Sequence, residues 1–262
     1  MEKQLFDISD LQPKTLSTQV ELDRRSPVPL YHQLKEILRS QIENGNWKSG
    51  DIIPNENLIA SDYGLSRGTV REAMDDLVRE GLLTRQRGRG TFVAAPKLEQ
   101  GILSLYSVHE YTKQTGHIPG SQILEFVTEQ ANKKVKEHLQ LSANSEIYKL
   151  VRTRLVDGEP IMYDRVYIPA SDFPGLSEKD ISNVSLYEIL SRDYGVVLGK
   201  AHQYFEPVLI DQYESQLLKV DKGSPALLIE RVTNRMNGTP VVYSKIIIRG
   251  DRCRFFAEIP NR

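Results

Sequence analysis

The sequence predicts an α+β protein in two parts: an N-terminal winged helix-turn-helix and a C-terminal antiparallel sheet with helices. Three observations support this prediction. Residues 55–93 contain two short helical segments around a glycine, followed by a glycine-rich hairpin. Residues 147–168 and 227–248 repeat a strand–turn–strand pattern, and each copy follows a short helical segment. With 262 residues, the chain is long enough for two domains of ordinary size.

The N-terminal part begins with a polar arm and one long helix. Residues 1–26 are expected to form a flexible arm, in which Arg24 and Arg25 either touch phosphates or belong to a solvated tail. From about Leu30, apolar residues recur at the spacing of an amphipathic helix, at Leu34, Ile37, Leu38 and Ile42. We expect Trp47 to anchor the core beneath the turn that follows.

The segment after this helix has the pattern of a helix-turn-helix. Gly64 separates two helices and supplies the positive φ of a tight corner, and Ser66 is a good N-cap for the second helix. The outward face of that helix carries Ser66, Arg67, Thr69 and Arg71. The first turns of such a helix enter the major groove of DNA, where arginine grips guanine and hydroxyls hold phosphate. The alternative is a helical hairpin with solvated arginines.

A hairpin with a basic tip follows directly. Gly81 ends the helix, and TRQRGRGTFV, from Thr84 to Val93, is typical of two strands joined by a flexible turn. Arg87, Gly88 and Arg89 form its tip, and Arg89 is placed to enter a minor groove, whose negative potential attracts it. The alternative is a solvated loop, but the position just after a recognition-type helix favours a wing that contacts DNA.

The C-terminal part, residues 103–262, follows a predicted linker at residues 94–102. Asp157-Gly158 and Asn237-Gly238 each separate two apolar strands, which is a strong hairpin signal. Both copies share a Gly-x-Pro-x-x-Tyr pattern with a basic residue two positions further on. Duplication explains this better than chance. The two helix-plus-hairpin units would then form one antiparallel sheet with helices on one face.

Two neighbouring arginines on the first hairpin indicate an anion site. Arg152 and Arg154 share one face of the predicted strand, because side chains alternate. Two adjacent guanidinium groups repel unless an anion lies between them, so the pair is a candidate clamp for a carboxylate or phosphate. The alternative is two solvated arginines. In a plain hairpin Arg152 pairs with Tyr163, so Asp164 faces the opposite side unless a β-bulge re-aims it.

Composition argues against several classes of protein. The formal net charge is −1, so DNA binding depends on local arginines. No stretch approaches the ~20 apolar residues of a membrane span, and the N-terminus lacks a signal-peptide pattern. The single cysteine, Cys253, excludes an internal disulfide and a multi-cysteine metal site. We expect a cytoplasmic protein with no metal and no cofactor.

Residues 27–93 resemble the winged-helix domain of the GntR family of bacterial transcription regulators. The matching motifs are PLYHQLKEILRSQIENG, W-x-x-G-D-x-x-P-x-E, LSRGTVREAMDDLVREGLL and RGRGTFV, in that order. The resemblance implies DNA contacts at Ser66, Arg67, Thr69, Arg71, Arg87, Gly88 and Arg89. The family usually has an arginine where this chain has Asn57, so that contact is weakened or becomes an amide contact. Gly68 replaces a residue that is often larger.

The rest of the chain resembles the UTRA ligand-sensing domain of the HutC subgroup, whose fold is shared with chorismate lyase. The resemblance implies an effector pocket lined by Ser107, Arg152, Arg154, Asp164 and Ser185. Ser185 precedes a predicted helix, whose free N–H groups suit an anion. Sugar-phosphate-sensing members often carry glutamate and tyrosine where this chain has Val242 and Ile248. The sequence thus keeps the anion clamp and indicates a small or partly apolar acid rather than an amino sugar.

Together these features predict an effector-responsive, sequence-specific DNA-binding transcriptional regulator. We expect a repressor that binds a near-palindromic double-stranded operator as a homodimer and leaves it when a small anionic metabolite binds. Two other classes stay open: a constitutive DNA-binding protein with a structural second domain, and a lyase-like enzyme. The enzyme hypothesis has little sequence support, because no nucleophile elbow, HExxH motif, P-loop or metal cluster occurs.

Overall fold

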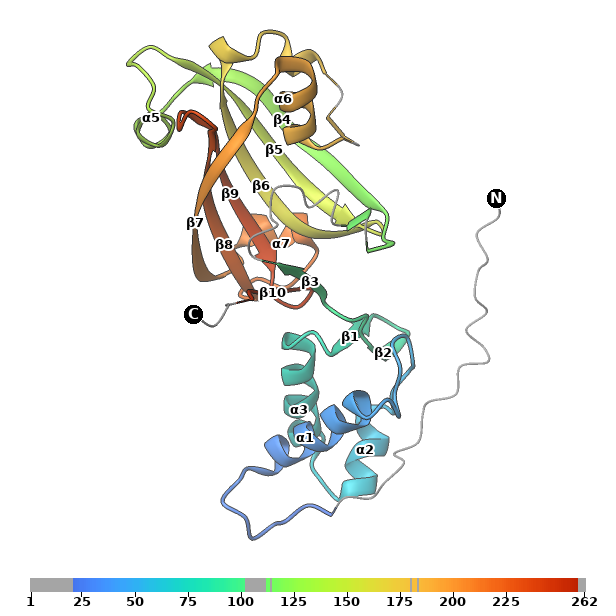
Figure 1. The fold of residues 1–262 in the computed structure, drawn as a ribbon. Helices are drawn as coiled ribbons and strands as arrows, with labels where there is room; N and C mark the ends of the chain where they lie inside the picture. The colour runs from blue at the N-terminus through green and yellow to red at the C-terminus, as the bar shows by residue number, and fades with distance from the viewer. Residues whose placement is uncertain (1–20, 102–111, 114, 180, 183, 259–262) are drawn as a thin grey trace, which may run out of the picture. The chain divides into compact units, whose positions relative to one another are not determined.

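The computed structural model describes residues 21–101, 112–113, 115–179, 181–182 and 184–258 (Figure 1). Contacts within the chain divide it into two compact units, Met1–Lys97 and Leu98–Arg262. Ser107 and most of the predicted arm lie outside the described residues. Among the helices that the structure describes, none is long and apolar enough to cross a membrane.

The first unit is a winged helix. Helices α1 (Leu30–Glu43), α2 (Glu56–Tyr63) and α3 (Arg67–Arg79) precede an antiparallel hairpin of β1 (Leu83–Gln86) and β2 (Gly90–Val93). Their apolar faces meet in one core, in which Leu34, Leu38, Trp47, Ile59, Val70, Met74 and Leu77 are at most 2% exposed. The predicted stripe of α1 and the predicted role of Trp47 are confirmed.

Local polar contacts fix the corner between α2 and α3. Gly64 adopts a φ of 60° at the end of α2, and Ser66 Oγ accepts a hydrogen bond from Thr69 N at 3.1 Å. The Arg24 guanidinium donates to the Gly64 carbonyl oxygen at 2.9 Å, which satisfies an acceptor left over at the helix end. The last residues of the predicted arm are therefore tied to the helix-turn-helix.

The second unit is built on a six-stranded antiparallel sheet in the order β4-β5-β6-β9-β8-β7. Its strands are β4 (Pro119–Gln130), β5 (Glu146–Val156), β6 (Glu159–Pro169), β7 (Leu198–Leu209), β8 (Pro225–Arg235) and β9 (Pro240–Arg249). Its helices are α5 (Lys133–Leu139), α6 (Leu186–Tyr194) and α7 (Gln212–Leu218), with short 3-10 turns at Ala170–Asp172 and Leu176–Glu178. A separate parallel pair joins β3 (Leu98–Gly101) to β10 (Cys253–Phe256), so the predicted linker contains a strand of this unit.

The sequence repeat is also a structural repeat. The series β4-α5-β5-β6 and β7-α7-β8-β9 have the same order, and both helices end on a left-handed residue, Gln140 and Lys219, each at φ 54°. The copies meet where β6 pairs with β9. There Arg165 lies opposite Lys245, which is its counterpart in the repeat. A local two-fold relation through this pair therefore exchanges the two copies.

The two hairpin turns differ in length. Asp157 and Gly158 have φ values of 52° and 82° and join β5 directly to β6, as predicted. In the second copy, residues 236–239 separate β8 from β9, and of its Asn-Gly pair only Gly238 has a positive φ. The longer second turn shifts the pairing register of β8 by one residue relative to that of β5.

The helices of the two repeats, α5 and α7, share one face of the sheet as predicted, and a further helix, α6, covers the other face. Helix α5 packs in a cluster with Tyr167 of β6, and α7 packs in a cluster with Tyr163 of the same strand. Helix α6 instead packs against Val166. Because neighbouring side chains of a strand point to opposite faces, α6 lies on the face opposite α5 and α7.

Candidate functional site

Three predicted DNA-contacting residues line one recess of the first unit. Asn57 near the start of α2, Arg67 at the start of α3 and Arg89 in the wing are all exposed around it. Ser66, Thr69, Arg71, Arg87 and Gly88 belong to the same helix-and-wing region without lining the recess. The fold thus brings together residues far apart in the sequence, as a recognition helix and wing require.

Arg71 is engaged within the protein, although it lies on the exposed side of α3. Its Nη2 lies 3.0 Å from Glu56 Oε2, and Arg85 contacts the same carboxylate from β1 at 3.3 Å. Among the described residues, no ion pair holds Arg67, Arg87 or Arg89, and the Arg89 guanidinium lies 5.9 Å from the centre of the Phe92 ring. Arg67 and the two wing-tip arginines therefore carry charge that is available to a phosphate or a base.

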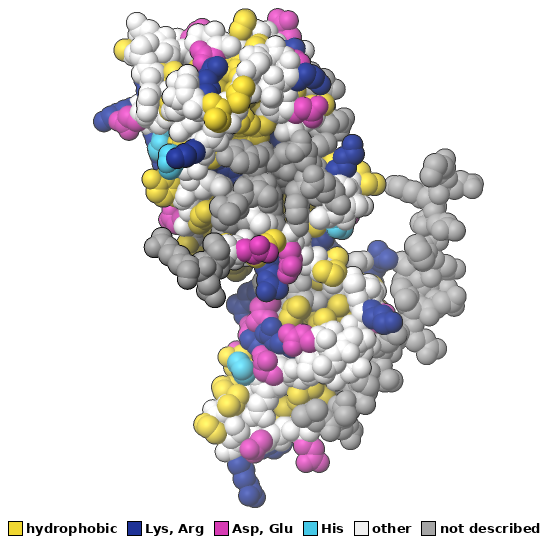
Figure 2. Space-filling model, in the orientation of Figure 1, with side chains coloured by type: hydrophobic (Ala, Val, Ile, Leu, Met, Phe, Trp, Pro, Cys, Tyr) yellow, Lys and Arg dark blue, Asp and Glu magenta, His cyan; other side chains and the backbone are white. Residues whose placement is uncertain are grey.

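Charged side chains are mixed on the surface. On the face drawn in Figure 2, basic and acidic groups alternate rather than forming one basic field, in keeping with a net charge of −1. DNA affinity from this chain therefore has to come from a few local arginines.

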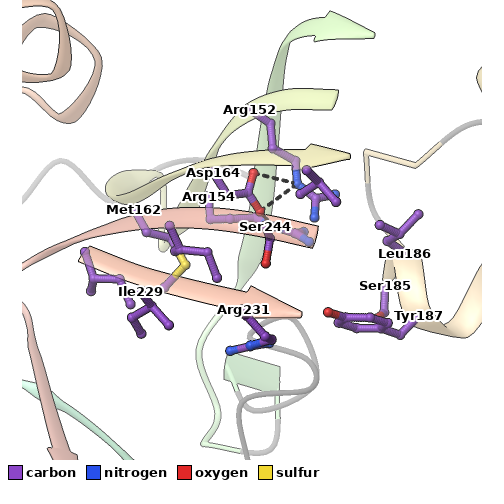
Figure 3. Close-up of a pocket in the computed structure, with 13 residues that line it drawn as sticks. Arg152, Arg154, Met162, Asp164, Ser185, Leu186, Tyr187, Ile229, Arg231 and Ser244 are labelled. Carbon is purple, nitrogen blue, oxygen red and sulfur yellow. Dashed lines mark hydrogen bonds and ion pairs between the residues drawn. The ribbon is translucent and has the colours of Figure 1, made fainter. Parts of the chain in front are cut away.

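A buried pocket lies on the α6 face of the sheet in the second unit (Figure 3). Its polar walls come from four strands and the start of α6. They are Arg152 and Arg154 of β5, Asp164 of β6, Arg231 of β8, Ser244 of β9, and Ser185 at the start of α6. Its apolar walls include Met162, Leu186, Ile229, Ile246 and Ile248. The cavity measures about 50 Å³, which is room for a few water molecules, so a metabolite needs side chains to move aside.

Asp164 lies between the two predicted clamp arginines. Arg152 Nε donates to both oxygens of the Asp164 carboxylate, at 3.0 and 3.1 Å, and Arg154 Nε lies 3.7 Å from Asp164 Oδ2. Arg154 also donates from Nη1 to Ser121 Oγ at 2.8 Å. The two arginines already hold one internal carboxylate, and the three side chains together keep one positive charge.

A β-bulge accounts for the position of Asp164. Arg154 pairs with Met162 and Leu155 pairs with Pro160, which leaves Ile161 without a partner across the hairpin. This extra residue moves Asp164 directly opposite Arg152, in place of Tyr163. Of the two alternatives that the sequence left open, the bulge is the one that forms.

Because Arg152 and Arg154 are buried, keeping both guanidinium groups charged and hydrogen-bonded is costly. Burial and the neighbouring Arg152 guanidinium lower the pKa of Arg154 to about 10, so Arg154 stays charged at neutral pH. Arg152 is 3% exposed, and its Nη1 is buried without a hydrogen-bond partner among the described residues. A buried unsatisfied donor costs about 1–3 kcal/mol. An oxyanion in the pocket would supply the missing acceptor.

Ser185 adds a hydroxyl and a helix end to the same pocket. It is the N-cap of α6 and is 3% exposed, and its side chain makes no capping hydrogen bond within the described part of that helix. The first N–H groups of a helix have no partner within the helix and favour an anion. The structure thus brings together four of the five predicted pocket residues; Ser107, the fifth, lies outside the described part of the chain.

Two polar pocket residues, Arg231 and Ser244, were missed by the sequence analysis. A gap-free match of the two repeats places Arg231 against Val151, which faces away from the pocket. The longer second turn shifts the register, so that Arg231 instead lies opposite Ser244 on the pocket face. A gap at the Asn237-Gly238 turn in the repeat alignment was the signal that could have found them.

The two apolar substitutions noted in the sequence have different positions. Ile248 lines the pocket, whereas Val242 packs in the cluster beneath α6. Among the described residues, no group of three or more His, Cys, Asp or Glu side chains could hold a metal ion. The arrangement is suited to binding anions, because its polar side chains are mainly guanidinium and hydroxyl donors.

Two family models match the chain: "Bacterial regulatory proteins, gntR family" over residues 30–93, and "UTRA domain" over residues 114–254. A relative named HTH-type transcriptional repressor NagR, from Bacillus subtilis, is 36% identical over 236 residues, which cover 90% of this chain and 97% of the relative. The chain belongs to the GntR family. Its second unit is a UTRA domain, which places it in the HutC subgroup.

A further relative and a solved structure also match most of this GntR-family chain. The histidine utilization repressor of Pseudomonas putida is 28% identical over 228 residues, which cover 87% of this chain and 91% of the relative. The crystal structure of PhnF from Mycobacterium smegmatis superposes with a TM-score of 0.63 at 27% identity and covers 89% of this chain and all of that one. The α+β fold expected from the sequence is therefore confirmed.

Proposed function

We propose that this GntR-family protein is a transcriptional repressor that leaves its operator when a small anionic metabolite enters the second unit. The observation that carries this proposal is the buried pocket, in which no described residue offers Arg152 Nη1 an acceptor and the neighbouring cluster keeps one positive charge. Two relatives with this domain organisation are named as repressors. A constitutive DNA-binding protein would have no use for an unsatisfied buried donor, which costs stability.

The first unit binds the operator. Arg67 reads a base in the major groove from the first turn of α3, and Asn57 lies beside it in the recess. Ser66, Thr69, Arg71, Arg87 and Gly88 contact the phosphate backbone or neighbouring bases. Arg89 enters the minor groove from the wing. A homodimer places two such units on a near-palindromic site.

The second unit senses the effector through Arg152, Arg154 and Ser185, with Ser107 as a further hydroxyl. The pocket touches the start of the unit through its apolar wall: Leu98 of β3 packs in the same cluster as Met162 and Ile229. β3 directly follows Lys97, where the DNA-binding unit ends. A ligand that displaces this wall therefore moves the strand that leads to the DNA-binding unit, and differential binding of the effector shifts the balance between the two arrangements.

The protein acts in the cytoplasm, where the operator and metabolites are, and it is not an enzyme. Its pocket arginines are suited to binding, and Asp164, which could serve as a base, is bound to Arg152 through both oxygens. A lyase would need a proton-transfer group free to face the substrate.

Operator binding is tested with the full chain and DNA from upstream of its own gene. We expect Arg67→Ala to cost about 1–3 kcal/mol per protomer and to relax specificity in footprinting. We expect Arg89→Ala to weaken binding to all sequences and to reduce the slope of log K against log salt by about one for each phosphate that is no longer neutralised. The control is Arg79→Ala, which removes an exposed arginine at the far end of α3. Full specificity in Arg67→Ala together with an unchanged salt slope in Arg89→Ala would refute the proposed DNA-binding surface.

A further inference from the structure

The two-fold relation within the sheet identifies a second cationic position in the pocket. This relation exchanges Arg165 with Lys245 and therefore exchanges the residues before them, Asp164 and Ser244. Arg152 lies directly opposite Asp164 in one hairpin, and Arg231 lies directly opposite Ser244 in the other. Arg231 is thus the structural counterpart of Arg152.

The two counterparts differ in what faces the arginine across the hairpin. Arg152 Nε lies 3.0 Å from an Asp164 carboxylate oxygen, whereas the equivalent position opposite Arg231 carries only the Ser244 hydroxyl. Ser244 is 3% exposed, and in the part of the chain that the structure describes its buried Oγ has no hydrogen-bond partner. Arg231 is 4% exposed and donates from Nε to the neutral amide oxygen of Gln203 at 3.0 Å. The second hairpin therefore keeps the arginine and lacks the carboxylate at the matching strand position.

The two arginines approach the pocket from different sides. Strands β6 and β9 separate β5 from β8, so the backbones of Arg152 and Arg231 lie three inter-strand spacings of ~4.8 Å apart along the sheet, about 14 Å. Figure 3 shows Arg231 across the pocket from Arg152, with Ser244 between them and the apolar Met162 and Ile229 on one side. An anion held by Arg152, Arg154 and Ser185 therefore leaves Arg231 to a different group of the ligand.

We propose that Arg231 and Ser244 form a second anion subsite and that the effector carries two anionic groups on a short, partly apolar skeleton. This inference rests on the proposed function and names the class of its effector. The first group, a phosphate or carboxylate, binds Arg152, Arg154 and Ser185. The second, a carboxylate, lies beside Arg231 as Asp164 lies beside Arg152.

The test uses pairs of probes that share one anionic group and differ in the second. Glycerol 3-phosphate is compared with 3-phosphoglycerate, and butyrate with glutarate, by isothermal titration of the full chain. In at least one pair we expect the two-anion member to bind at least tenfold more tightly. In Arg231→Gln and in Ser244→Asp we expect the ratio of the two affinities to fall to about one. Ser244→Asp is the sharper variant, because it keeps the arginine and supplies internally the carboxylate that the ligand would bring.

Thermal unfolding of each variant, followed by circular dichroism, shows whether it is folded. Equal affinities within both pairs, or a preference that persists in Ser244→Asp, would overturn the second subsite. The same holds if Arg231→Gln weakens both members equally, because that result describes one shared anion site. In each of these cases the proposed repressor function still stands if the one-anion probe releases operator DNA and Arg152→Gln abolishes that release.

Discussion

At the scale of single residues, Asp164 determines the electrostatic state of the pocket. It stands between two buried guanidinium groups and accepts two hydrogen bonds from Arg152. Without it, two like charges would share a site from which water is largely excluded. An anion that entered the pocket would therefore add to an arrangement that Asp164 already stabilises.

Replacing Asp164 by asparagine should destabilise the second unit by about 3–5 kcal/mol, because the change leaves buried charges without their partner. Urea unfolding measures this effect. Asp172→Asn is the matched control: Asp172 pairs at the surface with Arg235 at 2.6 Å, and its loss should cost less than about 1 kcal/mol. Inorganic phosphate should stabilise Asp164→Asn more than the parent protein. Equal stability of the two variants would contradict the role given to Asp164.

The sequence predicted Arg152 and Arg154 as a pair because alternation on a strand is a local property. Alternation alone could not place Asp164, which only the family resemblance indicated, or Arg231, because both positions depend on one inserted residue: Ile161 in the first hairpin and the extra turn residue in the second. A shift of one residue moves a side chain to the other face of a sheet. The alternation of side chains therefore did not predict the registers of the two hairpins, which are set by bulges and turn lengths.

At the scale of elements, a cluster around Glu230 fastens α5 to the sheet. The Glu230 carboxylate accepts from Lys134 of α5 and from Lys245 of β9, each at 2.7 Å, and from the Tyr243 hydroxyl at 2.8 Å. Burial alone would raise the pKa of Glu230, but these three hydrogen bonds outweigh it and lower the pKa to about 2. The carboxylate therefore stabilises the second unit in its ionised form.

This cluster predicts a specific acid dependence. Because the folded pKa of Glu230 is below its ordinary value of 4.5, its contribution is complete above about pH 4.5 and is lost as the pH falls toward 2. We expect Glu230→Gln to lower the free energy of unfolding by up to about 3 kcal/mol at pH 7 and by much less near pH 3. Urea unfolding between pH 3 and 7 measures this. Glu137→Gln, at an exposed pair with Lys133, should show no such trend. A pH-independent loss of stability in Glu230→Gln would contradict this role of the carboxylate.

The helices and hairpins themselves were largely predictable. Capping at Ser66, the turn at Gly64 and the Asp157-Gly158 hairpin depend on neighbours in sequence, and the structure has them where the sequence indicates. The position of α6 on the opposite face was not predictable, because it depends on which strand residues the helix meets. The strand at Leu98–Gly101 was missed for a similar reason, since its partner is β10, far along the chain at Cys253–Phe256.

At the scale of the whole molecule, one short segment connects the effector pocket to the DNA-binding unit. The pocket wall contacts β3, and β3 begins where the first unit ends. The sequence indicated both units, because each has its own motifs. It could not show the proposed route between them, because that route depends on an apolar contact between Leu98 and residues from distant strands.

Reciprocal coupling between operator and effector tests the central claim most directly. A thermal-shift screen of phosphorylated sugars, organic acids and acidic amino-acid breakdown products first identifies an anion that binds the parent protein and not Arg152→Gln. Its dissociation constant is then measured with and without saturating operator, and that of the operator with and without the anion. We predict that each ligand weakens the other by the same factor, about 5–150-fold. Tight binding of an anion in the pocket with no change in operator affinity would contradict the proposed repressor mechanism.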